Sequence, residues 1–325
     1  MRLQRGPGLR LPRREVERVG MDLSVDLAGV KLKNPVMLAS GTAGYGAELS
    51  SVIDLAAVGG IILKSVTEKP RRGNPGPRIW ETPCGMLNSI GLENKGVDAL
   101  VEEVLPSLAE SGVAVFASIA GDTVDEYARM AASLDGAPGV SALEVNVSCP
   151  NVEKGGIHFG IDAGATRAVA LAVHKNSELP FFVKLSAAVS DIAPVAQAAE
   201  SGGASGLSLI NTIPGLAVET ATRRPRLGAV TGGLSGPAIK PVALKAVWDC
   251  YIATGLPIIG CGGIYDVEDV CEFLVAGAAA VAVGTATFQN PTRVLEVIEA
   301  LPGALSALGV ESPCELTGSL QVQRG

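Results

Sequence analysis

The chain has few aromatic side chains, no closely spaced pair of cysteines and no long unbroken hydrophobic run. Its six cysteines show neither a C-x-x-C pair nor metal-ligand spacing, so we expect reduced thiols and no metal or iron–sulfur site here. The most apolar late stretch, residues 273–288, is interrupted by Gly277 and Gly284, which excludes a membrane span. A net charge of −7 argues against a nucleic-acid surface. We therefore expect a cytoplasmic protein that binds neither membranes nor nucleic acid.

Aliphatic side chains are abundant, since hydrophobic residues make up 47% of the 325 residues while only 4% are aromatic. Such a core suits packed parallel strands. Short aliphatic runs predict strands at 36–39, 60–64, 114–118, 142–147, 181–185, 206–211, 257–260 and 280–284. Helical patterns follow them at 48–58, 95–110, 124–134, 163–175, 192–201, 240–254, 267–276 and 292–301. Eight β/α units without a break in composition predict an α/β fold, a closed (β/α)8 TIM barrel, rather than an open sheet.

The first twenty residues differ in charge from the rest. They contain six arginines against Glu15 and Glu17, a balance of +4 that leaves −11 for the remainder. A signal peptide needs a continuous apolar stretch and a transit peptide is normally Ser-rich, and this segment has neither. We expect residues 1–20 to be a disordered basic leader or an overlong start, residues 21–305 to form the barrel domain, and residues 306–325 to be a C-terminal tail.

Two connections are too long for a plain barrel. Residues 65–94 and 212–238 are rich in proline and glycine and follow the second and sixth predicted strands. Long ordered connections are usually binding loops or lids. Because both follow strands, we expect them to lie as loop insertions over the carboxyl end of the barrel, where this fold keeps its active sites.

Polar or glycine residues stand at most of the predicted strand exits. Gly262-Gly263 and Gly284-Thr285 follow the seventh and eighth strands, where backbone N–H groups commonly hold a phosphate, although glycines also close tight turns. Lys64 and Lys184 each end an aliphatic strand. Such a lysine either extends to water or meets an anion, which here would be the edge of a reduced flavin or a substrate carboxylate.

Cys149 is the most informative residue. It lies in the run Glu144-Val145-Asn146-Val147-Ser148-Cys149-Pro150-Asn151, in which Pro150 stops a strand just after the cysteine. Free cysteines are commonly buried small hydrophobic residues. Polar neighbours are a poor lining for an apolar slot, so this thiol at a strand exit is a candidate for proton transfer.

The sequence resembles class 1 dihydroorotate dehydrogenases from about residue 21 to about residue 301. The resemblance rests on many ordered motifs, among them Ala39-Ser40-Gly41, Leu63-Lys64-Ser65, Asn88-Ser89-Ile90-Gly91-Leu92, Asn146 to Asn151, Ile210-Asn211-Thr212, Gly232 to Gly236 and Gly260-Cys261-Gly262-Gly263. Cysteine at position 149, where the membrane-associated class carries serine, points to class 1. The continuation from Asn151 to Gly156 resembles the 1B subgroup, whose electrons reach NAD through a second subunit.

The resemblance implies an FMN enzyme that oxidises dihydroorotate to orotate in de novo pyrimidine biosynthesis, with Cys149 as the base at C5 and hydride passing from C6 to the flavin. Substrate contacts are implied for Lys64, Asn88, Ser89, Ile90, Gly91, Leu92, Asn146, Asn151, Asn211 and Thr212. Flavin contacts are implied for Ala39, Ser40, Gly41, Lys64, Ser65, Asn146, Lys184, Ile210, Ser235, Gly236, Gly262, Gly263, Gly284 and Thr285. The implied partner is an electron-transfer subunit with FAD and a 2Fe-2S cluster, in a heterotetramer built on a homodimer of this chain.

Three other interpretations stay open at this point. A class 1A enzyme would pass its electrons to fumarate. A barrel resembling the pyrimidine-reducing domain of dihydropyrimidine dehydrogenase would also use a cysteine beside FMN and would reduce uracil. A flavin-binding partner without catalysis would not need the lysines, asparagines and cysteine that this chain retains.

Overall fold

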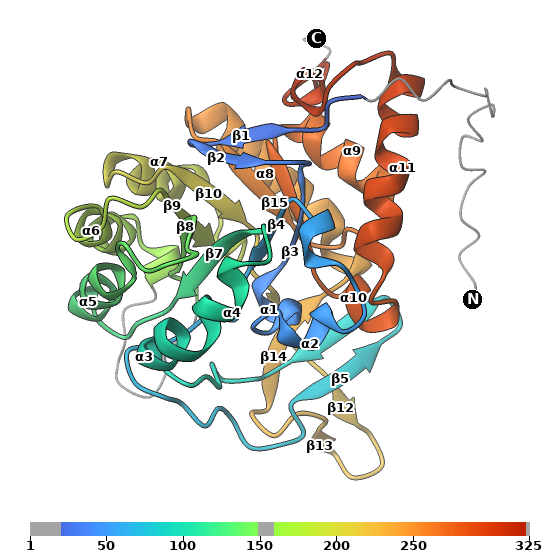
Figure 1. The fold of residues 1–325 in the computed structure, drawn as a ribbon. Helices are drawn as coiled ribbons and strands as arrows, with labels where there is room; N and C mark the ends of the chain where they lie inside the picture. The colour runs from blue at the N-terminus through green and yellow to red at the C-terminus, as the bar shows by residue number, and fades with distance from the viewer. Residues whose placement is uncertain (1–20, 149–158, 323–325) are drawn as a thin grey trace.

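The computed structural model describes residues 21–148 and 159–322. Eight parallel strands close into a barrel in the order β10-β15-β16-β3-β4-β7-β8-β9 (Figure 1). Their bounds are β3 (Val36–Leu38), β4 (Gly60–Ile62), β7 (Ala114–Ile119), β8 (Ala142–Asn146), β9 (Phe181–Leu185), β10 (Gly206–Leu209), β15 (Ile258–Cys261) and β16 (Ala280–Val283). The (β/α)8 barrel expected from the sequence is confirmed.

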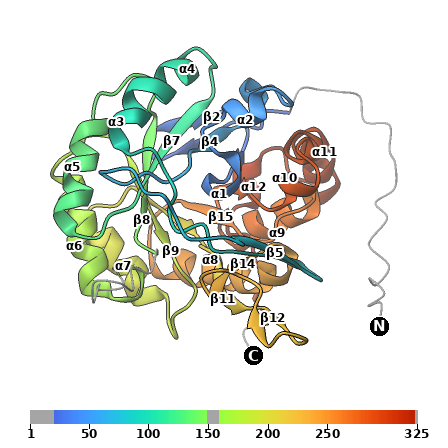
Figure 2. The ribbon, with the colours of Figure 1, turned by 90° about the horizontal axis from the view of Figure 1, so that it is seen from below.

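Six long helices lie around the barrel, as Figure 2 shows. They are α5 (Val124–Leu134), α6 (Ala163–His174), α7 (Ala193–Ser201), α8 (Lys240–Ala253), α9 (Val267–Ala276) and α11 (Arg293–Leu308). Thr123, Asp162 and Asp266 begin three of them, because each side chain accepts a hydrogen bond from a backbone N–H of the first turn. Shorter helical segments are α1 (Ser40–Ala43), η3 (Phe159–Ile161), η4 (Pro237–Ile239), α10 (Ala286–Gln289) and α12 (Pro313–Leu316).

Two of the expected helices are wrong as continuous elements. Residues 48–58 contain only α2 (Ala47–Ser50) and η1 (Leu55–Ala57), because the Asp54 side chain accepts from the Ala56 N–H at 2.9 Å and begins a new turn. Residues 95–110 divide into α3 (Val97–Ala99), a π-helical η2 (Leu100–Val104) and α4 (Leu105–Ala109). Pro106 lacks the N–H that a continuous α-helix would use there, so the turn before it widens.

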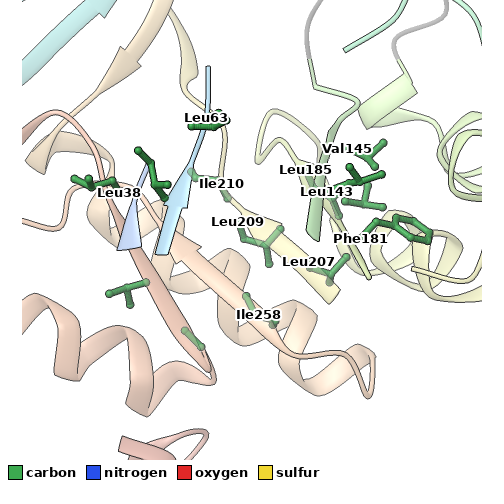
Figure 3. Close-up of a cluster of buried hydrophobic side chains, with 14 of the residues drawn as sticks. Leu38, Leu63, Leu143, Val145, Phe181, Leu185, Leu207, Leu209, Ile210 and Ile258 are labelled. Carbon is green, nitrogen blue, oxygen red and sulfur yellow. The ribbon is translucent and has the colours of Figure 1, made fainter. Parts of the chain in front are cut away.

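The buried hydrophobic residues form two clusters. The outer one joins the strands to the helices, and Figure 3 shows part of it, with Leu38 of β3, Leu143 of β8 and Leu207 of β10 among its members. The inner one fills the barrel lumen. Its far end is closed by the hairpin β1 (Val25–Leu27) and β2 (Val30–Leu32), whose apolar side chains pack with those of the lumen.

The lumen changes from apolar to polar toward the carboxyl ends of the strands. Residues two apart on a strand share a face. On β8 the inward row runs from Ala142, in the inner cluster, to Glu144 and Asn146. The inward rows of β7 and β9 change in the same way, from Phe116 to Ser118 and from Phe182 to Lys184. A polar layer therefore lies directly above the apolar core of the lumen.

The two long connections meet over the carboxyl end of the barrel, opposite the β1–β2 hairpin (Figure 1). Loops are expected here from the sequence, whereas the structure forms an antiparallel sheet in the order β11-β14-β6-β5. Its strands are β5 (Ile79–Thr82), β6 (Gly85–Asn88), β11 (Ile213–Leu216) and β14 (Thr231–Ser235), with the small hairpin β12 (Val218–Glu219) and β13 (Arg224–Pro225) beside it. The central pairing of β6 with β14 fixes one connection to the other.

The end of the described chain is packed rather than extended from the barrel. Helix α11 continues to Leu308, beyond the boundary at 305 that the sequence suggested, and α12 packs against α9 with Leu316 only 6% exposed. No helix within residues 21–148 and 159–322 combines the length and apolar character needed to cross a membrane.

Candidate active site

A large cavity of about 1390 Å³ opens between the carboxyl end of the barrel and the antiparallel sheet above it. Residues at or just beyond the ends of the barrel strands line it, among them Ser40 after β3, Lys184 on β9 and Gly284 after β16. The sheet contributes the opposite wall, including Asn88 at the end of β6 and Ser235 at the end of β14. Strand ends and the inserted sheet therefore enclose one space.

Every candidate site residue within the described ranges lines this cavity. From the strand exits these are Ala39, Ser40, Gly41, Lys64, Ser65, Asn146, Lys184, Ile210, Asn211, Thr212, Gly262, Gly263, Gly284 and Thr285; from the inserted sheet and its loops they are Asn88, Ser89, Ile90, Gly91, Leu92, Ser235 and Gly236. Cys149 and Asn151 lie outside the described residues. Residues as far apart in the sequence as Ala39 and Thr285 thus meet in one place.

Lys184 is a buried cation at the floor of the cavity. Its Nζ lies 3.3 Å from each carboxylate oxygen of Glu144 and donates to Ser40 Oγ at 3.2 Å. Burial by itself lowers the pKa of Lys184, but the negative charge of Glu144 and its hydrogen bond, together with Cys261, raise that pKa above the usual lysine value. The ammonium therefore stays charged at neutral pH although its side chain is only 8% exposed.

Two amide side chains lie above this cation and contact each other. Asn146 Nδ2 donates to Ser65 Oγ at 3.3 Å, while its Oδ1 accepts from Asn211 Nδ2 at 3.4 Å and from the Ser148 backbone N–H at 3.3 Å. Asn211 Oδ1 in turn accepts from the Thr212 N–H at 2.8 Å. The amides are thus held in fixed orientations that offer both donors and acceptors to a ligand.

Lys64 lies nearer to solvent than Lys184. Its side chain is 31% exposed, and its Nζ is 4.0 Å from Glu93 Oε2, which also accepts from Arg78 at 2.8 Å. An ion pair of this length and exposure contributes little to stability. Lys64 can therefore turn toward an anionic ligand with little loss of stability, because its contact with Glu93 is weak.

Ser89 has an unsatisfied hydroxyl. Its Oγ is buried and has no hydrogen-bond partner among the described residues, and Ser89 is one of the residues that line the cavity. A buried polar group without a partner is costly, so this hydroxyl is suited to bind a polar ligand.

Glycines and hydroxyls form another wall of the cavity. Thr285 Oγ1 donates to Ser235 Oγ at 2.7 Å. Gly263 has a φ of +80°, and a Cβ there would lie 2.9 Å from the Lys240 backbone nitrogen and 3.0 Å from Gly236 O. Only glycine fits, so the cavity wall at this point is backbone, which is the surface that phosphate groups use in proteins.

Several polar residues below the cavity were not among the predicted site residues, although Ser118 stands at a predicted strand exit. Glu144, Ser118 and Ser208 are each 0% exposed, and both serines donate to the Glu144 carboxylate. Their signal was present, because period-two alternation places Glu144 on the same inward face as Asn146. Cys261, also in the polar layer, has its pKa raised by burial, with Lys184 acting in the opposite direction.

The cavity at the carboxyl ends of the barrel strands contains a buried ammonium and oriented amide side chains. This is the arrangement of a (β/α)8-barrel enzyme. A family model described as dihydroorotate dehydrogenase matches residues 22–305. The chain belongs to the dihydroorotate dehydrogenase family.

Three similar proteins are each named "Dihydroorotate dehydrogenase B (NAD(+)), catalytic subunit". The protein from Desulforudis audaxviator is 53% identical over 296 residues, which cover 91% of this chain and 96% of that protein. The protein from Geobacter sp. is 50% identical over 301 residues, covering 93% and 99% respectively. A protein from Thermoanaerobacter sp. is 50% identical over 302 residues, covering 93% of this chain and all of its own length.

Proposed function

We propose that this chain is the catalytic subunit of an enzyme that oxidises dihydroorotate to orotate with bound FMN, and that its electrons pass through a partner subunit to NAD. One observation carries the proposal: residues chosen from sequence motifs alone converge on one cavity at the catalytic end of the barrel. The relatives that are 53% and 50% identical to this chain are named as catalytic subunits of an NAD(+)-dependent dihydroorotate dehydrogenase, and this supports both dihydroorotate oxidation and NAD as the acceptor.

The chemistry of the cavity fits FMN. Lys184 would face the edge of the isoalloxazine ring, and the backbone around Gly263, with Ser235 and Thr285, would hold the phosphate. Ala39 to Gly41, Ser65, Ile210, Gly236, Gly262 and Gly284 would contact the rest of the cofactor. When bound, FMN would supply the acceptor for the hydride that leaves C6 of dihydroorotate.

The substrate would lie between the amides and the inserted sheet. Asn88, Asn146, Asn211 and Thr212 would pair with the ring, because an amide both donates and accepts as a pyrimidinedione edge requires. The unpartnered hydroxyl of Ser89 and the backbone from Ile90 to Leu92 would complete this wall. Lys64 would neutralise the substrate carboxylate, exchanging its long contact with Glu93 for a closer one.

Proton removal from C5 is assigned to Cys149, and Asn151 is assigned to the ring, both by resemblance. Both residues lie just after β8, whose last residue, Asn146, lines the cavity. A thiolate suits this task because its ordinary pKa is about 8.5.

The partner follows from the same proposal. It would be a smaller flavoprotein carrying FAD and a 2Fe-2S cluster, in a heterotetramer built on a dimer of this chain. The words "catalytic subunit" in the relatives' name support the existence of another subunit.

The test separates the possible acceptors. Purified chain with dihydroorotate should reduce an artificial dye but not NAD, and should gain NAD reduction when the partner is added. Fumarate turnover by the chain alone would instead indicate the 1A type. Efficient NAD reduction without a partner, or uracil reduction in place of dihydroorotate oxidation, would contradict the proposal.

A further inference from the structure

Glu144 is a buried carboxylate that does not line the cavity and has no assigned role. It lies on the inward face of β8, one layer below the cavity floor, and its side chain is 0% exposed. An ionised group in a barrel lumen is costly to bury, and replacing a buried ion pair by apolar residues is often neutral or stabilising. The apolar layer immediately below, with Ala142 and Phe182, shows that this lumen can be filled without charge.

The Glu144 carboxylate accepts four hydrogen bonds, and the donors are two serine hydroxyls and the Lys184 ammonium. Oε1 accepts from Ser118 Oγ at 3.0 Å and Oε2 accepts from Ser208 Oγ at 2.9 Å, while Lys184 Nζ lies 3.3 Å from both oxygens. These donors come from β7, β10 and β9, so three strands point their polar groups at one residue of β8. Both carboxylate oxygens are satisfied, as burial requires.

A hydrogen-bond relay leads from Glu144 back to the cavity. Since Ser118 donates its hydroxyl proton to Glu144, its oxygen must accept from Ser65 Oγ, which lies 2.7 Å away. Ser65 Oγ then accepts from Asn146 Nδ2 at 3.3 Å, which leaves Asn146 Oδ1 to receive Asn211 Nδ2 at 3.4 Å. The acceptor-only carboxylate sets the direction of the two hydroxyl bonds, while Asn146 Oδ1 also accepts from the Ser148 backbone N–H at 3.3 Å.

We propose that Glu144 is a positioning residue of the active site: its carboxylate holds the Lys184 ammonium against Ser40 and, through Ser118, turns the Ser65 hydroxyl so that its oxygen accepts from the Asn146 amide. This inference rests on the proposed function in taking FMN as the ligand that meets Lys184 and Asn146. Glu144 touches neither cofactor nor substrate and acts through these two side chains.

The charge on Lys184 depends on few neighbours. Among the described residues, the titratable groups that act on it are Glu144 from β8 and Cys261 from β15, and Lys64 after β4 lines the same cavity. The other groups bonded to the pair, Ser40, Ser118 and Ser208, are neutral hydroxyls. Removing the Glu144 charge therefore leaves a buried ammonium without a counter-ion, and it releases its proton.

The test uses three variants: Glu144→Gln, Lys184→Met and the double variant that combines these two changes. Ser208→Ala is the control, because it removes one donor to Glu144 but keeps the charges of Glu144 and Lys184. FMN affinity of the apoprotein is measured by fluorescence titration, and the flavin midpoint potential is measured across a range of pH. Glu144→Gln should weaken FMN binding about tenfold or more, as loss of a hydrogen bond to a charged group does, and Ser208→Ala should change it by less than about threefold.

Two further readouts separate positioning from general structural damage. In Glu144→Gln, two-electron reduction of the flavin should be accompanied by uptake of one more proton than in wild type, because the neutral Lys184 amine is protonated when the flavin becomes anionic. The double variant has no lysine at this position and should not take up the extra proton. The double variant should also lose much less FMN affinity than the two single losses together, because Glu144 acts in part through Lys184.

The outcomes divide cleanly. If Glu144→Gln keeps the wild-type FMN affinity and proton count, or if the extra proton survives in the double variant, the inference is overturned. If Glu144→Gln does not fold but the double variant does, the unpaired Lys184 side chain prevents folding, which supports the inference. If neither variant folds, Glu144 is needed only for the stability of the barrel, and the inference fails. A wild-type chain that binds no FMN overturns the proposed function itself, whereas a flavin-loaded wild type with an unaltered variant overturns only this inference.

Discussion

The residues of the site differ in how firmly they are held. Lys184 is buried and held by Glu144 and Ser40, whereas Lys64 is partly exposed and has only a 4.0 Å contact with Glu93. A buried ammonium with a fixed position suits a cofactor that stays in place. A looser one suits a substrate that binds and leaves in every turnover.

Lys64→Ala tests the substrate side of this division. It should weaken orotate binding about tenfold or more, because a charge-assisted contact with the carboxylate is lost while the flavin remains bound. Orotate affinity is measured from the change in the flavin spectrum on titration. Lys31→Ala, an exposed lysine on β2 at the other end of the barrel, serves as the control and should bind orotate normally. Equal orotate affinity in Lys64→Ala and wild type would remove the carboxylate assignment.

Cys149→Ala tests the proton-transfer step. The variant should keep its FMN but lose on the order of 10²- to 10⁴-fold in flavin reduction by dihydroorotate, the usual contribution of a positioned acid–base group. Cys149→Ser should also be slow, since a hydroxyl is far less acidic than a thiol. The rate is measured by rapid mixing without oxygen. The exposed Cys314 provides a matched control, because Cys314→Ala should reduce its flavin at the wild-type rate. Fast reduction in Cys149→Ala would exclude the base role.

At the scale of elements, local signals predicted the barrel well. Helices α5 and α9 begin and end where the sequence analysis placed them, because Thr123 and Asp266 are strong N-caps and Gly277 ends α9 in the left-handed conformation. Within the helix expected over 95–110, the stretch Leu100–Val104 just before Pro106 is π-helical, and this proline is the sequence signal for the change.

The inserted sheet could not be read from the sequence in the same way. Its central pairing joins Asn88 to Gly233 and Leu87 to Leu234, partners that are far apart in the chain. Strand patterns of four or five residues rich in glycine and proline look like loops, and only the meeting of the two connections supplies the missing hydrogen bonds. Motifs therefore predicted Asn88 and Ser235 as candidate site residues, while the sheet that positions them is seen only in the structure.

A glycine pair tests the close backbone approach in the cavity wall. Gly263→Ala should lower the free energy of unfolding by about 1–3 kcal/mol and weaken FMN binding, because its φ is +80° and the added Cβ would lie 2.7 Å from Lys240 Cβ. Gly303→Ala, within α11 and with nothing near its added Cβ, should stabilise the chain by up to about 1 kcal/mol. Urea unfolding and flavin titration measure both. A Gly263→Ala chain as stable and as tight for FMN as wild type would contradict the close approach.

At the scale of the whole molecule, the β1–β2 hairpin closes one end of the barrel, and the cavity lies at the other end. Val25, Leu27, Val30 and Leu32 pack into the lumen and lie within the first elements after residue 20. The family model begins at residue 22, next to this hairpin. The charge shift in the sequence therefore falls beside the first packed element.

Truncation distinguishes leader from barrel. If residues 1–20 are a leader, a chain that begins at Met21 should keep its FMN content, and its free energy of unfolding should lie within about 0.5 kcal/mol of that of the full chain. A chain that begins after Leu32 should lose the hairpin, expose the apolar lumen and fail to accumulate as folded protein. Denaturant unfolding and flavin content measure both. Strong destabilisation by removal of residues 1–20 alone would show that the leader is part of the domain.

The central claim is that the cavity at the carboxyl end of the barrel holds a flavin that dihydroorotate reduces. The most direct measurement is a single turnover without oxygen, in which the purified chain with its bound FMN is mixed with dihydroorotate. The account predicts that the flavin absorbance bleaches in the absence of any partner and that one orotate forms for each flavin reduced. A flavin that stays oxidised in the presence of excess dihydroorotate, in a chain that binds FMN and orotate normally, would contradict it.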